Sequence, residues 1–171
     1  MRVITILMVM IAVSGAVHGQ QNEAAKYIGY KYAGVLPGVT MPNGVKHLGG
    51  GLIGDINADP VYGISQLEKG RTKMLWLEAS TGKNETGVTG WEVKDVLAFP
   101  AMKAADYLFF YGDPAISCTR DGRDIPNLVG VGQIIRKRAQ FRPSKFWIAN
   151  LTTKKFEAVP VAGVKCEYSE P

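Results

Sequence analysis

Short runs of alternating apolar and polar residues, separated by turn-forming residues, follow one another along most of the chain. A period of two is typical of β-strands, and Gly, Pro, Asn and Asp between the runs mark turns. The pattern favours many short strands over long helices. Strands are predicted at residues 26–34, 61–67, 72–78, 90–94, 104–111, 115–118, 128–139, 145–150, 155–159 and 164–168.

The run at 72–78 differs from the others because both of its faces are apolar. Met74 and Trp76 lie on one face, and Leu75 and Leu77 lie on the other. A strand that is apolar on both sides is covered on both sides, so this run predicts the centre of a sheet.

The segment after this strand contains a second tryptophan. Residues 79–89 are polar and Gly-rich, which predicts a hairpin loop, and Trp91 in the next strand is expected to pack against Trp76. Residues 95–97 are expected to form one helical turn, because Pro100 disfavours helix in the residue before it.

The motif Gly90-Trp91-x-Val93, followed by Asp95-Val96-Leu97, resembles the closing segment of bacterial SH3-like domains. The resemblance covers residues 61–99 and implies a small barrel of a kind that often binds cell-wall peptide or acts as a targeting module. It assigns no binding residue. We therefore expect a mostly β fold, in which an SH3-like barrel is extended by a disulfide-tied antiparallel β-meander at 104–168.

The N-terminus predicts export. Residue Arg2, an apolar run at 3–13 and small residues up to Gly19 are typical of a cleaved signal peptide, here residues 1–19. The apolar run is shorter than the roughly 20 residues that span a bilayer, and no later stretch is long and apolar enough. A single secreted or periplasmic domain at 20–171 is expected, with a possible sub-boundary near 100–105. In an oxidising compartment, Cys118 and Cys166 are predicted to form a disulfide.

Positive charge is concentrated in the C-terminal part of the chain, whose formal net charge is +5. Residues 20–117 carry nine basic and ten acidic side chains, whereas residues 118–171 carry ten basic and five acidic ones. Arginine binds phosphate and carboxylate through two hydrogen bonds, and neighbouring aromatic rings add stacking. The predicted anion-binding residues are Arg136, Lys137, Arg138, Arg142, Lys145, Lys154 and Lys155.

The expected partner is an anionic envelope component, such as a glycan or a lipid head group, or another protein; an intracellular nucleic acid is not expected. The alternative is that these charges keep the surface soluble and protect a sheet edge from pairing.

Catalytic and metal-binding patterns are weak. One histidine follows the predicted signal peptide, His47, next to a glycine run, and residues 47–54 are expected to be a flexible loop or an anion cradle. The run 55–59 begins like a calcium loop, but Pro60 and Gln66 replace the required Gly and acid, so we predict a polar turn without metal. A glycosidase-type carboxylate pair could arise in space from Glu78, Glu92, Asp95, Asp106 and Asp113.

The sequence thus predicts a non-enzymatic binding or accessory protein of the cell envelope, without a cofactor. Two alternatives stay open: a small exported enzyme or enzyme inhibitor that uses the glycine-rich segment at His47, and a purely structural envelope protein. Sequons at Asn84 and Asn150 fall in or beside predicted turns, where a glycan could be attached.

Overall fold

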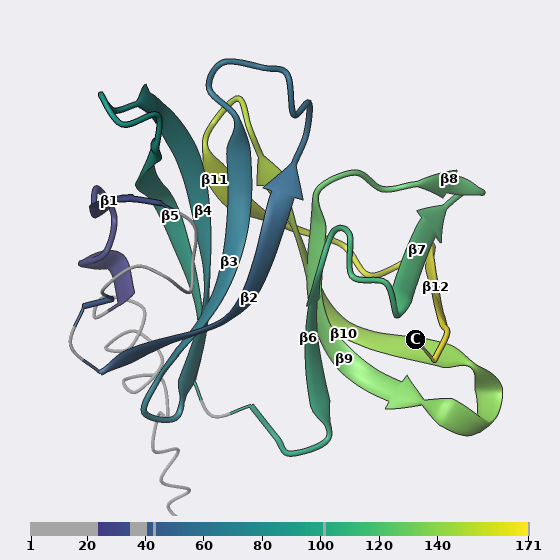
Figure 1. Cartoon of the computed structure of the whole chain (residues 1–171). Coiled ribbons are helices and arrows are strands. Elements are labelled where there is room, and N and C mark those ends of the chain that lie inside the picture. Colours follow the sequence, from purple (N-terminus) through teal and green to yellow (C-terminus); the bar gives the residue numbers. More distant parts are fainter. Residues whose placement is uncertain (1–23, 35–40, 43, 101, 171) are drawn as a thin grey trace, which may run out of the picture.

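The computed structural model describes residues 24–34, 41–42, 44–100 and 102–170. The predicted signal peptide lies outside these residues. The fold is mostly β and consists of two antiparallel sheets that pack against each other (Figure 1). Within the described ranges, no helix has the length and apolar character needed to cross a membrane.

Sheet A, the first of the two, has five strands in the order β1-β5-β4-β3-β2. The central position of β4 confirms the prediction for the strand that is apolar on both faces. The strands are β1 (Lys31–Ala33), β2 (Val45–Ile53), β3 (Tyr62–Lys69), β4 (Thr72–Lys83) and β5 (Thr89–Pro100).

Sheet B has the order β6-β9-β10-β12-β7-β8, with β11 beside one end of β10, and it is strongly curled (Figure 1). Its strands are β6 (Asp106–Phe110), β7 (Ile116–Arg120), β8 (Arg123–Asp124), β9 (Leu128–Ile135), β10 (Gln140–Asn150), β11 (Lys155–Val159) and β12 (Val164–Tyr168). A 3₁₀ turn, η1 (Arg136–Arg138), joins β9 to β10.

The predicted disulfide is present. Cys118 in β7 and Cys166 in β12 stand directly opposite each other, and their sulfur atoms are bonded. This pairing brings the last strand next to one much earlier in the chain. The strands of sheet B are therefore antiparallel, as expected, but their spatial order is not that of a simple meander.

The predicted SH3-like barrel is not confirmed. Residues 61–99 provide β3, β4 and β5, which are the three inner strands of an open sheet. Strands β1 and β2, from outside that stretch, extend the sheet on either side. The chain passes from sheet A to sheet B between Pro100 and Asp106, and the two sheets share a core.

Three local predictions are wrong. Residues 95–97 continue strand β5 instead of forming a helical turn, because they pair with Leu75–Leu77 of β4. The Asp95 carboxylate also accepts a 2.7 Å hydrogen bond from the backbone N–H of Phe156 in β11. The strands predicted at 128–139 and 145–150 leave out residues 141–144, but these residues lie within β10, where Pro143 coincides with an irregularity in the pairing with β9. The predicted strand at 26–34 begins with a helical turn, and only Lys31–Ala33 is a strand.

The inter-sheet core is built from apolar side chains of both sheets. Ile64, Leu75 and Leu77 of sheet A pack in one cluster with Val129 and Ala149 of sheet B. Alternation along β4 places Leu75 and Leu77 on this inner face, whereas Trp76 points to the outer face of the sheet. Burial on both faces makes sheet A a rigid platform for side chains that project outward.

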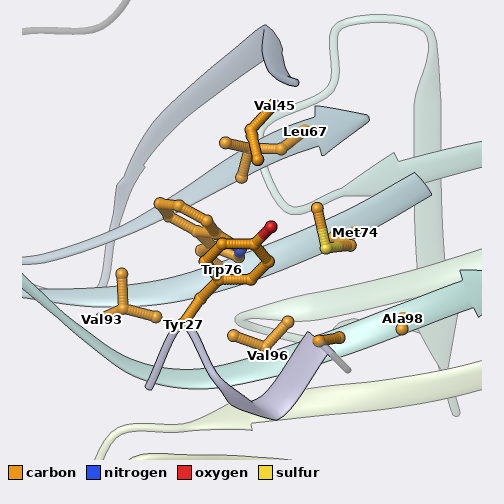
Figure 2. Close-up of a cluster of buried hydrophobic side chains, with 9 residues drawn as sticks. Tyr27, Val45, Leu67, Met74, Trp76, Val93, Val96 and Ala98 are labelled. Carbon is orange, nitrogen blue, oxygen red and sulfur yellow. The ribbon is translucent and has the colours of Figure 1, made fainter. Parts of the chain in front are cut away.

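The outer face of sheet A is covered at one end by the N-terminal turn (Figure 2). Trp76 is fully buried there, and its ring centroid lies 5.2 Å from that of Tyr27 and 5.9 Å from that of Tyr30. The predicted packing of Trp76 against Trp91 is wrong, because Val96, not Trp91, stands opposite Trp76 in β5. Trp91 lies further along β5, opposite Ser80 of β4.

A third cluster fills the curl of sheet B. The rings of Phe109 and Phe146 meet edge to face at 6.0 Å, and both side chains are buried. A methyl group at Gly130 would lie 2.6 Å from each ring, closer than carbon atoms pack. Glycine at this position therefore lets the two rings approach the strand.

Candidate functional site

A hollow of about 320 Å³ lies on the outer face of sheet A. Each of the five strands contributes a side chain to its lining. These side chains are Tyr32 of β1, His47 of β2, Ser65 of β3, Glu78 of β4 and Trp91 of β5.

Strand register explains why these side chains share one face. Residues that stand directly opposite each other in an antiparallel pair point to the same side of the sheet. Tyr32 stands opposite Trp91, and Gly63 stands opposite Glu78. Ser65 lies two residues after Gly63 in β3 and therefore points to the same side.

The Glu78 carboxylate lies beneath the hollow and is 3% exposed. Its Oε2 accepts a 2.8 Å hydrogen bond from the Ser65 hydroxyl. Its Oε1 is buried and has no hydrogen-bond partner among the described residues. Trp76 Nε1, two residues earlier on the same face of β4, is likewise buried without an acceptor there. Glu78 lines the hollow and Trp76 does not, so the lining holds one acceptor that the described chain does not use.

Burial controls the charge of this carboxylate. Removal from water raises the pKa of Glu78 to about 7, although the hydrogen bond from Ser65 and the nearby Tyr32 hydroxyl act in the opposite direction. At neutral pH the group is thus close to its own midpoint. A carboxyl with this pKa exchanges its proton near pH 7, whereas a surface glutamate stays ionised at that pH.

The two other titratable groups of the hollow are neutral at pH 7. Burial, and next the nearby Glu78 carboxylate, raise the pKa of Tyr32, so its hydroxyl keeps its proton. Burial lowers the pKa of His47, and a backbone hydrogen bond at Gly49 opposes this effect only in part. The residues that line the hollow include neither lysine nor arginine. Glu78 is therefore the only lining side chain that carries charge near neutral pH.

Glycines keep the hollow open. The segment expected to be a flexible loop, 47–54, lies mostly within strand β2, with a bulge between His47 and Gly49. A Cβ at Gly50 would lie 2.6 Å from the backbone oxygen of Ile64, so the close approach of β2 to β3 requires glycine there. The prediction of a loop is wrong. Glycine often indicates irregular structure, but here it permits tight pairing of two strands.

Gly63 forms part of the floor. A Cβ at this position would lie 3.7 Å from the Trp91 ring and 3.9 Å from Glu78 Oε2, both ordinary van der Waals distances. A methyl group at residue 63 would thus meet no clash, and a longer side chain there would start between the indole and the carboxylate. This position offers a way to fill the hollow while the sheet keeps its structure.

The predicted anion-binding residues do not all lie together. Arg136, Lys137 and Arg138 form η1 at one end of β10, whereas the lysine pair, Lys154 and Lys155, lies at the other end of that strand. An 11-residue strand is roughly 35 Å long. One small ligand cannot contact both ends.

Two members of the predicted set meet at a groove. Arg138 and Arg142 line a groove of about 910 Å³ between β10 and β12, together with Lys165. All three residues have no acidic partner among the described residues, whereas Arg136 pairs with Glu170 at 2.8 Å. Anion binding stays a prediction for this groove. Of the remaining residues, Lys145 is exposed on β10.

Among the residues that the structure describes, no group of three or more His, Cys, Asp or Glu side chains is placed so that it could hold a metal ion. The Asp55 carboxylate accepts a 2.9 Å hydrogen bond from the N–H of Asn57, so this segment is the predicted polar turn. The side chains of Asn84 and Asn150 accept backbone hydrogen bonds in the turns that follow them.

The site could be anticipated only in part from the sequence. Glu78 was one of five carboxylates considered, while Tyr32 and Ser65 were not singled out, and Trp91 was assigned to the core. One available signal was an acid that follows Met74 and Trp76 at alternate positions of a strand with two apolar faces. Such a position predicts a buried carboxylate.

Comparisons with protein-family models, with curated proteins and with solved structures found no match to this chain.

Proposed function

We propose that the protein is an exported, non-enzymatic binding protein that holds a small organic ligand in the hollow of sheet A. The observation that carries the proposal is the Glu78 side chain, which lines a 320 Å³ hollow and whose buried Oε1 has no hydrogen-bond partner among the described residues. Leaving such an atom unpaired costs about 1–3 kcal/mol. A ligand that donates a hydrogen bond to Oε1 would recover that free energy.

The walls of the hollow support the same proposal. Small-molecule sites combine apolar surface with a few convergent polar groups and a residue of perturbed pKa. Trp91 and Leu52 supply apolar surface here, and Tyr32, Ser65 and Glu78 supply the polar groups. The Cys118–Cys166 disulfide is consistent with an oxidising, extracytoplasmic compartment.

A second candidate is acid–base catalysis. The Ser65 hydroxyl donates to Glu78 at 2.8 Å, and a carboxylate with a pKa near neutrality suits a general base that activates a hydroxyl. Ser65 is 6% exposed and lies inside a strand, so substrate would reach it only from the hollow. Substituting Ser65→Ala separates the two functions, because it abolishes catalysis through Ser65 and leaves most of the binding surface in place.

The test is a search for ligands with a matched pair of variants. A mixture of small aromatic amines, alcohols and acids is screened against the wild-type protein by saturation-transfer NMR. Gly63→Leu fills the space between Trp91 and Glu78, and Gln133→Leu adds the same side chain at an exposed position of β9 in sheet B. We expect binding of at least one compound to be lost in Gly63→Leu and kept in Gln133→Leu.

Two results would overturn the proposal. One is a wild-type protein that binds no compound of the mixture. The other is a Gly63→Leu variant that folds, as judged by its circular dichroism spectrum, and binds the same compounds as the wild type.

A further inference from the structure

The geometry points to the chemical class of the ligand: we propose that the hollow binds an organic cation, an ammonium group attached to an apolar body. This inference rests on the proposed function and makes it more specific. The evidence is the charge balance, the hydrogen bonding and the aromatic rings around Glu78.

The first step is the charge balance. When Glu78 is ionised, its negative charge lies at 3% exposure, and the lining residues provide no lysine or arginine to balance it. Glu92 of the same sheet differs, because its carboxylate forms a 2.8 Å ion pair with Lys94 near the surface. A buried charge is stable only when it is paired and hydrogen-bonded. A ligand cation would supply the missing partner.

The second step is hydrogen bonding. Ser65 occupies Oε2, whereas Oε1 has no partner among the described residues. An ammonium group carries donors only, so one N–H can bond to Oε1 without leaving a new acceptor unpaired. A ligand carboxylate could offer no donor there and would meet a like charge.

The third step is the aromatic wall. Tyr32 and Trp91 stand directly opposite each other in β1 and β5 and line the same hollow. Aromatic faces attract cations, and tryptophan does so best. The third titratable group, His47, is neutral at pH 7 because burial lowers its pKa, so it does not repel a cation.

The test compares three probes that share a phenyl ring and differ in the charge of the head group: benzylamine, benzyl alcohol and benzoate. Binding is measured by calorimetry or by ligand-observed NMR at about pH 8, where benzylamine is charged and Glu78 is mostly ionised. We expect benzylamine to bind at least about tenfold more tightly than benzyl alcohol, and benzoate to bind least.

Two variants locate the effect. Glu78→Gln keeps the shape of the side chain and removes its charge, so we expect it to lower benzylamine affinity about tenfold and to change benzyl alcohol affinity by less than about threefold. Glu92→Gln removes an exposed charge from the same sheet and should change neither affinity. Gly63→Leu should weaken the binding of all three probes.

The outcomes separate the inference from the function on which it rests. If benzyl alcohol or benzoate binds as well as benzylamine and is lost in Gly63→Leu, the hollow is a binding site but not one for cations. Equal affinity of benzylamine for the wild type and a folded Glu78→Gln variant overturns the inference too. If none of the three probes binds, the cation inference is wrong. The proposed function is then decided by the saturation-transfer screen of the ligand mixture.

Discussion

The substitution Glu78→Gln should change how the stability of the protein depends on pH. In the unfolded chain this carboxyl has its usual pKa of 4.5, and burial raises the pKa to about 7 in the folded protein. Between these values the unfolded state has lost the proton and the folded state still holds it. The unfolded state then binds fewer protons, so the free energy of unfolding falls as the pH rises.

The size of the effect follows from the two pKa values. Each pKa unit corresponds to about 1.4 kcal/mol. The two pKa values give a cost of about 1 kcal/mol at about pH 5 and about 3 kcal/mol at about pH 8. Below the unfolded value both states are protonated and the cost vanishes; above the folded value it is constant. Glutamine does not titrate, so the variant lacks this cost at every pH.

The assay is urea unfolding of both proteins, with the disulfide intact and tryptophan fluorescence as the signal. The difference in unfolding free energy between variant and wild type should shift by about 2–3 kcal/mol in favour of the variant between about pH 5 and about pH 8. Other titrating groups are common to both proteins, and their contributions largely cancel. A difference that is constant over this range would show that Glu78 is not a buried carboxylate.

Three further predictions concern the rest of the molecule. Replacing both Cys118 and Cys166 by serine should lower the unfolding free energy by about 4 kcal/mol, because their separation of 48 residues defines the loop that the bond closes; an unchanged urea midpoint contradicts this. Gly130→Ala places a methyl group 2.6 Å from two buried phenylalanine rings and should cost about 1–3 kcal/mol in the same assay. Removing both Arg138 and Arg142 should weaken binding to dextran sulfate and flatten its salt dependence, whereas removing the lysine pair should not; equal effects of the two double substitutions would count against the groove.

The sequence alone determined the fold class, because strands are indicated by the pattern of residues close together in the chain. Alternating apolar residues, turn residues between them and the doubly apolar run at 72–78 were enough to predict a mostly β protein with a central strand there. The disulfide was predicted for a similarly simple reason, namely two cysteines in a chain expected to be exported.

Only the tertiary structure decided which strands are neighbours and what lies between them. Sequence patterns do not state that β1 pairs with β5, and this pairing places Tyr32 opposite Trp91. The same limit explains why seven basic residues, close together in the sequence, are spread along the whole length of a strand. A strand keeps residues that are near in sequence far apart in space, whereas pairing joins residues from distant segments.

Glu78 illustrates the division most clearly. Its place after Met74 and Trp76 in β4 is a local property that the sequence contains. Its burial, the hydrogen bond from Ser65 and the raised pKa arise only when strands from separate parts of the chain align around it. The physical reason is that desolvation and hydrogen bonding depend on all neighbours in space, and five strands contribute them here.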